Sequence, residues 1–354
     1  HDKNAGRFTL WGIQLLARSP GFEINDLGRM QTADDINFNG DFILRDTKPH
    51  KTFRSYMVQF TSDAGWNFGG IRQYSSIGLN NSVTFSNFTR ASFNFRYNFR
   101  SLSDGLTRGG PLMGTPRFIN VNGSFNSRPN RPVTWSVNAR HTDDELGGWS
   151  WTFGSTLSVR PGARWQASVD PSYTRSADAR QYIATRPGGS AATFGNRYIF
   201  GFVDRSQLSA RFRLNYAVTP DFTVEGYAEP FAASGKYSKL GELEAAKSRD
   251  LVQYGAAGTG TTITRMADSS FRVTDGNGSF TLANLDFNRL SFRSNLVLRW
   301  EWQPGSTAFL IWQNNRQRAT PFGRSVNGGD LLDAIGAKGD NFLAMKVSYW
   351  IGVK

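Results

Sequence analysis

The sequence contains no cysteine, which excludes a disulfide framework, a thiolate metal site and a cysteine nucleophile. Only three histidines are present, His1, His50 and His141, and they lie far apart in the chain. No apolar run approaches the ~18 residues of a membrane-spanning helix. The sequence shows no catalytic constellation and no metal or cofactor motif, so we do not predict an enzyme, a bound metal or a cofactor.

The sequence contains two groups of adjacent acidic residues. They occur at Asp34-Asp35 and at Asp143-Asp144-Glu145. Both sets fall in predicted loops, so we interpret them as solvated turn residues. A loop Ca²⁺ site is the alternative, because carboxylate oxygens are its usual ligands.

The charge of the chain is strongly positive. Its 41 Lys and Arg residues outnumber 28 Asp and Glu residues, which gives a net charge of +13. Such an excess suits nucleic acid, anionic lipid or an anion-conducting lumen. A Lys/Arg block, a Gly-rich phosphate loop and an RNA-binding aromatic signature are all lacking, so nucleic acid is not a predicted partner. The first residue, His1, follows no initiator Met or signal peptide, and we expect a mature or truncated piece.

Aromatic residues are abundant although long apolar runs are lacking. The chain has 28 Phe, 10 Trp and 11 Tyr, yet its mean hydropathy is -0.44. This combination is typical of a membrane β-barrel wall, since only every second residue of a strand meets lipid. A soluble β-sandwich or propeller is the alternative that composition leaves open.

The last stretch, from Phe342 to Ile351, shows the alternation most clearly. Leu343, Met345, Val347 and Tyr349 share one face of an extended chain, whereas Lys346 and Ser348 fall on the other. Ten residues are enough to cross a hydrocarbon core at a tilt. The pattern therefore predicts a membrane-crossing strand.

The same apolar–polar alternation recurs through the chain and excludes a helical period. We expect about 14 to 16 spanning antiparallel strands. The region 175–204 is interpreted as one long hairpin or two short strands. The clearest alternating segments are 91–99, 119–125, 133–140, 149–159, 164–173, 208–216 and 290–302, and further strands are expected at 8–18, 36–46, 52–61, 66–86, 222–231 and 307–312.

Connections of two lengths also alternate along the chain. Short turns on one rim and long loops on the other are typical of bacterial outer-membrane barrels. We therefore predict an all-β fold in which residues 1–354 form a single outer-membrane β-barrel domain, with short periplasmic turns, long extracellular loops and both chain ends at the short-turn rim. The tight turns lie at 128–131, 160–162, 219–221 and 303–305, and the long links at 101–116, 233–288 and 317–340, of which 233–288 is the predicted long extracellular loop region.

If the apolar faces meet lipid, the charged residues of the polar faces point into the lumen, because a charge at mid-membrane on the lipid side costs about 2 to 4 kcal/mol. The lumen-facing candidates are Arg96, Arg140, Arg164, Arg211, Arg213, Arg293, Arg299, Glu225, Glu229 and Glu301. These seven arginines and three glutamates leave a surplus of four positive charges. Whether they form a structural ladder or a solute site stays open. The aromatics expected at the lipid face or interface are Trp149, Trp151, Trp165, Trp300, Trp302 and Tyr349.

Four segments together resemble one family, the C-terminal barrel of outer-membrane proteins that carry domain of unknown function 5916. They are Ser19–Gly28, Leu106–Met113, Arg293–Glu301 with Pro304–Ser306, and Phe342–Trp350. The resemblance implies an outer-membrane barrel without implying a reaction. Family members usually carry an N-terminal domain similar to carbohydrate-binding module family 9, and we expect that residues 1–354 do not include it.

These expectations lead to a functional hypothesis. We expect a porin-like channel, receptor or surface platform in the cell outer membrane of a Gram-negative-type bacterium, with a role in glycan or oligosaccharide binding or uptake. Expected partners are outer-membrane lipid, lipopolysaccharide, glycans and other outer-membrane or periplasmic proteins. The alternatives are a membrane-anchored hydrolase acting on carbohydrate, a purely structural membrane anchor and a soluble all-β binding protein.

Overall fold

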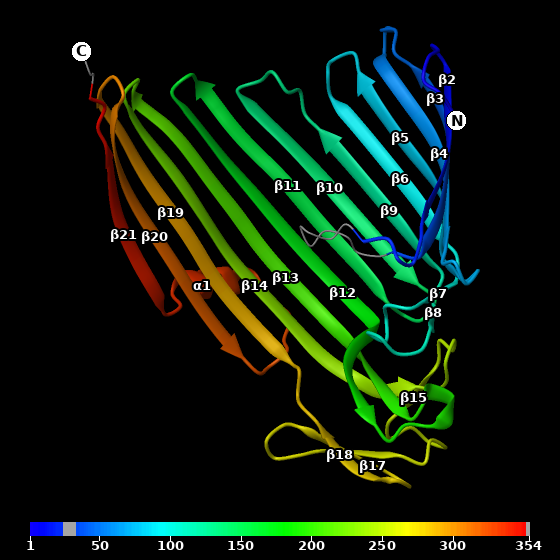
Figure 1. Cartoon of the computed structure of the whole chain (residues 1–354). Helices are drawn as coiled ribbons and strands as arrows, with labels where there is room; N and C mark the ends of the chain where they lie inside the picture. The colour runs from blue at the N-terminus through cyan, green and yellow to red at the C-terminus, as the bar shows by residue number, and fades with distance from the viewer. Residues whose placement is uncertain (24–32, 352–354) are drawn as a thin grey trace.

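A computed structural model describes residues 1–23 and 33–351, and one large antiparallel sheet dominates it (Figure 1). The sheet has 16 strands, of which β1 and β15 are only two and three residues long. In spatial order the strands are β1 (Asp2–Lys3), β2 (Thr9–Arg18), β3 (Asp35–Asp46), β4 (Phe53–Trp66), β5 (Arg72–Phe85), β6 (Arg90–Asn98), β9 (Phe118–Asn126), β10 (Val133–Asp144), β11 (Trp149–Gly162), β12 (Trp165–Pro187), β13 (Asn196–Thr219), β14 (Phe222–Leu243), β19 (Phe287–Gln303), β20 (Ser306–Thr320) and β21 (Gly339–Ser348), with β15 (Leu251–Gln253) beside β14.

Smaller elements fill the longer connections. No helix among the described residues is long and apolar enough to cross a membrane. The small elements are the hairpin β7 (Ser101–Ser103) and β8 (Met113–Thr115), the 3-10 turn η2 (Ala191–Thr193), the three-stranded sheet β16 (Thr262–Arg265), β17 (Phe271–Asp275) and β18 (Gly278–Leu282), and the helix α1 (Gly328–Ile335).

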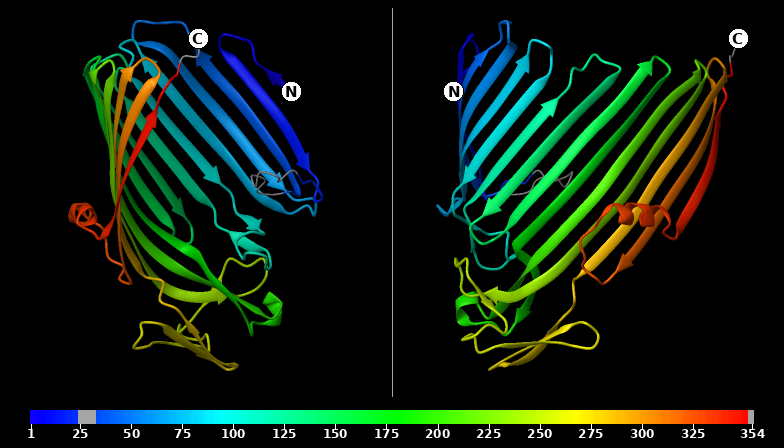
Figure 2. Two further views of the ribbon diagram at one scale, coloured as in Figure 1. Left: turned by 60° about the vertical axis from the view of Figure 1, so that its left-hand side comes forward. Right: turned by 180° about the vertical axis from the view of Figure 1, so that it is seen from behind.

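The large sheet curves into a trough. Figure 2 shows β2 to β6 on one wall and β14 to β21 on the opposite wall. The edge strands β1 and β21 do not pair with each other in the part of the chain that the structure describes. The prediction of an all-β antiparallel sheet is confirmed, and closure into a barrel stays a prediction.

The two faces of the trough differ in chemistry. Helix α1 lies on the convex side (Figure 2), and its neighbourhood packs against Ala232 and Leu290. The strand register joins these two residues to a row of cross-strand neighbours, Phe153, Tyr173 and Leu208, so the apolar set faces outward. The intervening polar row faces the concave side and runs through Asn80, Asn94, Asn122, Arg140 and Thr152.

The predicted arrangement, with short turns at one rim and long loops at the other, is found only in part. Three of the four predicted tight turns join strands at one rim, at the top of Figure 1, whereas the fourth, at 160–162, is the end of β11 and the turn at the same rim is 163–164. The long connections 99–117, 188–195, 244–286 and 321–338 lie at the other rim, but this long-loop rim also carries the short turns 67–71 and 145–148. The chain end after β21 lies at the short-turn rim, where the Trp350 amide donates to the Ser306 hydroxyl (3.1 Å). The expectation for the other end is wrong, because the His1 amino group bonds to the Ile13 carbonyl (3.0 Å), within the length of β2.

Several predicted boundaries need correction. The run 66–86 is not one strand, because β4 continues through Asp63 to Trp66 and a turn follows. The Asn67 side chain accepts from the Ile71 amide (2.9 Å), and Gly70 supplies the left-handed residue with φ 75°. Part of the segment Ser19–Gly28, one of the four that carry the family resemblance, lies outside the described residues.

The middle strands are longer than the sequence pattern suggests. Region 175–204 is one long hairpin, with β12 and β13 paired as far as Pro187 and Asn196. Strand β14 runs on to Leu243, so the long connection is 244–286 rather than 233–288. Its extension, 233–243, mixes glycine, serine and the charged residues Lys236, Lys239 and Glu242 with few apolar residues, and it therefore lacks the alternation that identified the wall.

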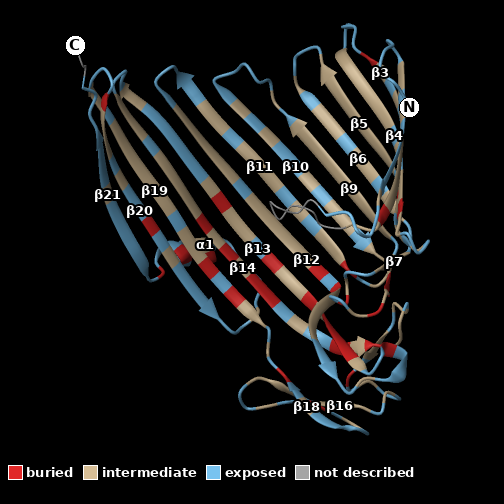
Figure 3. Ribbon diagram, viewed as in Figure 1, coloured by how far each residue is buried: buried red, intermediate tan, exposed pale blue. Residues whose placement is uncertain are grey.

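The far ends of β12 to β14, together with β7, β8 and β15 to β18, form a small unit that we call the cap. Buried residues gather there and around α1 (Figure 3). One cap cluster packs β16–β18 against β13 and β14, and the other packs the β7–β8 hairpin against them. The first contains Ile199, Leu240, Tyr254, Val273 and Leu282, and the second Met113, Tyr198, Phe200 and Leu243.

Candidate functional site: the concave polar face and its rim

Amide and guanidinium groups gather on the concave face of β5, β6, β9 and β10. Their side chains line a shallow pocket of about 330 Å³. Amides offer both a donor and an acceptor, and guanidinium groups offer paired donors. The pocket therefore suits hydroxyl and carboxylate groups. Its polar lining consists of Asn80, Asn94, Asn120, Asn122, Arg96 and Arg140.

Ion pairs bridge neighbouring side chains on this face. Arg211 lies 3.5 Å from Glu229, as the register across the Pro220 turn predicts, and Arg299 lies 2.7 Å from Glu301. Two further arginines have partners that the sequence analysis did not count. Arg96 contacts Asp63 (3.0 Å) and Arg213 contacts Asp170 (3.3 Å). The seven predicted arginines thus face five acids, and the surplus falls from four charges to two.

Three of the predicted arginines keep no such partner. Among the described residues, no acidic group lies within 4.0 Å of Arg140, Arg164 or Arg293. Arg140 lines the amide pocket, whereas Arg164 and the predicted Glu225 line a second pocket of about 570 Å³ near the short-turn rim. Arg293 lies directly across from Glu229 in the strand register. These guanidinium groups are available to a solute.

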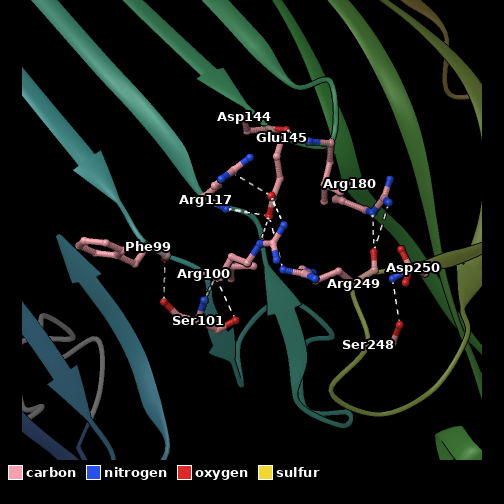
Figure 4. A network of polar contacts seen from close by, with 12 residues as sticks. Phe99, Arg100, Ser101, Arg117, Asp144, Glu145, Arg180, Ser248, Arg249 and Asp250 are labelled. Atoms are coloured by element: carbon pink, nitrogen blue, oxygen red, sulfur yellow. Dashed lines mark hydrogen bonds and ion pairs between the residues drawn. The ribbon is translucent and has the colours of Figure 1, made fainter.

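At the long-loop rim, three arginines contact a single carboxylate, that of Glu145 (Figure 4). Glu145, in the β10–β11 turn, accepts from Arg100 Nε (2.6 Å), contacts Arg117 Nε (3.1 Å) and lies 3.4 Å from Arg249 Nη1. Hydrogen bonds from Arg100 and then from the Arg117 amide lower the pKa of Glu145 to about 2. The interpretation of Glu145 as a solvated turn residue is therefore wrong.

The Glu145 cluster also joins the cap to the rim. Arg249 comes from the connection between β14 and β15, which pairs with the β7–β8 hairpin through two backbone bonds, Gly114 N to Ser248 O (2.9 Å) and Lys247 N to Leu112 O (2.7 Å). Arg180 of β12 donates to the Arg249 carbonyl (3.2 Å), and burial lowers its pKa. These contacts hold the arginines of the rim in fixed positions.

A second charged group lies inside the cap and is structural. Arg197 is only 6% exposed and pairs with Glu242 (3.1 Å) and with Asp275. The Tyr254 hydroxyl donates to Glu242 (3.1 Å), and burial raises the pKa of Tyr254. Arg197, Glu242 and Asp275 lie on β13, β14 and β17, so these ion pairs hold the strands of the cap together rather than binding a solute.

The remaining chemical candidates do not come together. Asp35 is buried at the start of β3 and pairs with Arg18. His50 contacts Asp46 (2.9 Å), and hydrogen bonds from the Lys48 amide and His50 lower the pKa of Asp46. Within residues 1–23 and 33–351, no three His, Asp or Glu side chains gather as a metal site requires.

The predicted interface aromatics lie on the convex side in two bands. Near the short turns, Trp300 contacts Trp302 with ring centroids 6.1 Å apart, and Trp302 stacks on Tyr349 at 6.5 Å. Trp165 lies at the same level, next to the turn at 163–164. Trp149 and Trp151 lie at the opposite end of β11, and Trp151 stacks on His141 at 4.0 Å.

The family comparison covers the whole chain. A family model described as "Domain of unknown function (DUF5916)" matches residues 1–354. No curated protein matches the sequence. Since the family description names no activity, the function has to be argued from the geometry of the two faces and the rim.

Proposed function

We propose that this chain, which belongs to the DUF5916 family, is an outer-membrane β-barrel protein that acts as a channel or receptor for anionic polar solutes, acidic oligosaccharides among them. The proposal rests on the separation of apolar and polar side chains onto the two faces of the sheet. Large apolar side chains are exposed along the convex face, including Leu157 (43%), Trp312 (44%) and Leu343 (67%). A continuous apolar face is unfavourable in water but matches a hydrocarbon environment.

The dimensions of the wall support a membrane location. The two aromatic bands on β11 and its neighbours lie about eleven residues apart, from the turn after Gly162 to Trp151. A tilted strand crosses a hydrocarbon core in about 9 to 11 residues. In the proposed orientation, the short turns face the periplasm and the cap lies outside a Gram-negative-type cell.

The charge on the concave face favours anions. Arg140, Arg164 and Arg293 have no acidic partner within 4.0 Å among the described residues, and the amide pocket beside Arg140 suits sugar hydroxyls. At the mouth, the Glu145 cluster holds three arginines around one carboxylate. Fixed positive charge in a narrow lumen concentrates anions. An acidic oligosaccharide would meet the rim arginines first and the amide pocket next.

Two measurements test this proposal. The protein should require detergent for extraction and should migrate differently on a gel before and after heating. In planar bilayers with a KCl gradient, its reversal potential should show anion preference. A protein that stays soluble without detergent refutes the membrane location, and cation preference in an open channel refutes the solute class.

The cap supports a second role as a surface platform that binds glycans or other outer-membrane proteins. Its two hydrophobic clusters give it a core of its own. Loops that only connect strands do not need such a core. A barrel that inserts but conducts no ions would leave this platform role as the function.

A further inference from the structure

Helix α1 exposes an apolar face on the convex side of the wall. The Asn327 side chain accepts from the Gly329 amide (2.8 Å), while the Asp330 side chain accepts from the Asn327 amide (2.8 Å), so a capping box starts the helix. Ala334 is buried against the wall. Leu332, in contrast, is 72% exposed, and Ile335 one turn later is also exposed.

The helix is fixed to the wall by specific contacts. The Val326 amide donates to Ser206 Oγ (2.9 Å), and the Arg324 amide donates to Ser234 Oγ (2.8 Å). Gly323 permits this approach, because a Cβ there would lie 2.5 Å from the Gly235 carbonyl oxygen. The exposed leucine and isoleucine are therefore held in place and do not belong to a loose loop.

The level of α1 matches the outer boundary of the proposed membrane span. Ala232, which the α1 region covers, lies ten residues after Phe222 at the short-turn rim. Leu208 on the next strand lies eleven residues from Thr219. Since about 9 to 11 residues cross the hydrocarbon core, α1 lies where the acyl chains of the outer leaflet meet their headgroups.

Basic side chains surround the exposed apolar residues. Arg318 pairs with Asp333 (3.1 Å), and Arg324 pairs with the buried Asp330. Both guanidinium groups nevertheless remain about half exposed. The basic residues of this convex region outnumber its acids by five to three: Arg175, Lys236, Arg316, Arg318 and Arg324 against Asp204, Asp330 and Asp333.

We propose that α1 and segment 321–327 form a docking surface for a phosphorylated, multiply acylated lipid of the outer leaflet. Its acyl chains pack beside Leu332 and Ile335, and its phosphate groups lie against Arg318, Arg324 and Lys236. This assignment rests on the proposed membrane function. It adds a specific lipid partner, selected by phosphate as well as by apolar contact.

Native mass spectrometry of the detergent-purified protein tests the assignment, with rough lipopolysaccharide and phosphatidylethanolamine as competing probes. The wild type should retain the phosphorylated lipid. Replacing Arg318 and Lys236 by Gln should weaken its retention roughly fivefold for each residue. The double variant Leu332→Asn with Ile335→Asn should also weaken it, and both exposed sites allow folding.

Two controls separate this site from a general loss of charge or apolar surface. Phe194→Asn removes an apolar side chain that is 71% exposed in the β12–β13 turn, outside the span. Arg272→Gln removes an exposed charge from β17 of the cap. Neither change should affect lipid retention. Equal retention by the α1 variants and the wild type overturns the docking surface, whereas a wild type that needs no detergent overturns the membrane function itself.

Discussion

Replacing Leu157 by Arg places a charge at the middle of the proposed membrane span. Leu157 faces outward on β11, five residues from Gly162 at the short-turn rim. At a rise of ~3.3 Å per residue and a tilt of ~45°, it lies about 12 Å from that rim, near the centre of the apolar band. The expected loss in folding free energy is about 2–4 kcal/mol.

The depth dependence of this cost distinguishes lipid from water. Trp151 lies about 26 Å from the rim by the same geometry, so Trp151→Arg should cost only about 0–1 kcal/mol through its position. Thr156 faces the concave side beside Ser136, and Thr156→Arg should be tolerated, as should Ser150→Arg.

The assay is urea unfolding of the four variants in lipid vesicles, followed by tryptophan fluorescence and by the heat-dependent gel shift. The proposed order of destabilisation is Leu157→Arg, then Trp151→Arg, with the two concave-face variants near the wild type. Equal losses at Leu157 and Thr156 would contradict the face assignment. Equal losses at Leu157 and Trp151 would contradict the membrane boundaries.

Four further predictions concern charge, the cap, pH and topology. Arg140→Ala should lower the anion preference that the reversal potential measures. The double variant Arg211→Ala with Arg213→Ala should lower it further, because it leaves Glu229 and Asp170 without their partners. An unchanged preference in both variants would show that these arginines do not determine the ion selectivity. Arg197→Met should destabilise the cap by about 3–5 kcal/mol, because two partly buried acids lose their nearly fully buried partner. Hydrogen exchange in β16–β18 measures this, with Arg272→Met as the control. The pKa of Glu145 is lowered from 4.5 to about 2, so its stabilisation is complete above pH 4.5 and is lost as pH falls towards 2; exchange of the Gly114 and Lys247 amides should follow this window, and Glu145→Gln should abolish it. A tag inserted at Gly258 should be reachable on intact cells, and labelling only after rupture of the outer membrane would reverse the orientation.

The wall of the fold could be predicted from the sequence because it obeys a local rule. A side-chain period of two fixes which residues share a face, so the alternating segment 133–140 matches β10 and the segment 208–216 falls within β13. The prediction of a single strand over 66–86 failed because the end of β4 and the start of β5 show the same apolar–polar alternation. Only the turn chemistry of Asn67 and Gly70 marks the break between them.

The cap and α1 could not be predicted in the same way, because their partners are distant in sequence. Glu145 and Arg249 are 104 positions apart, and no local pattern relates them. The extension of β13 is buried on both faces, so alternation disappears where the chain leaves the wall. The capping box at Asn327 and Asp330 is the one local signal that could have revealed the helix.

Exposure separates the charges that serve structure from those available for function. Arg197 is almost fully buried, and it is matched by two acids because an unpaired buried charge is costly. On the concave face the paired arginines are about 36% to 50% exposed, and such pairs contribute only about 0–1 kcal/mol each. Stability therefore gives little reason to place seven arginines there. The proposed binding of anionic solutes would account for them, because solvated arginines such as Arg140 can exchange water for a ligand without leaving an acid unpaired.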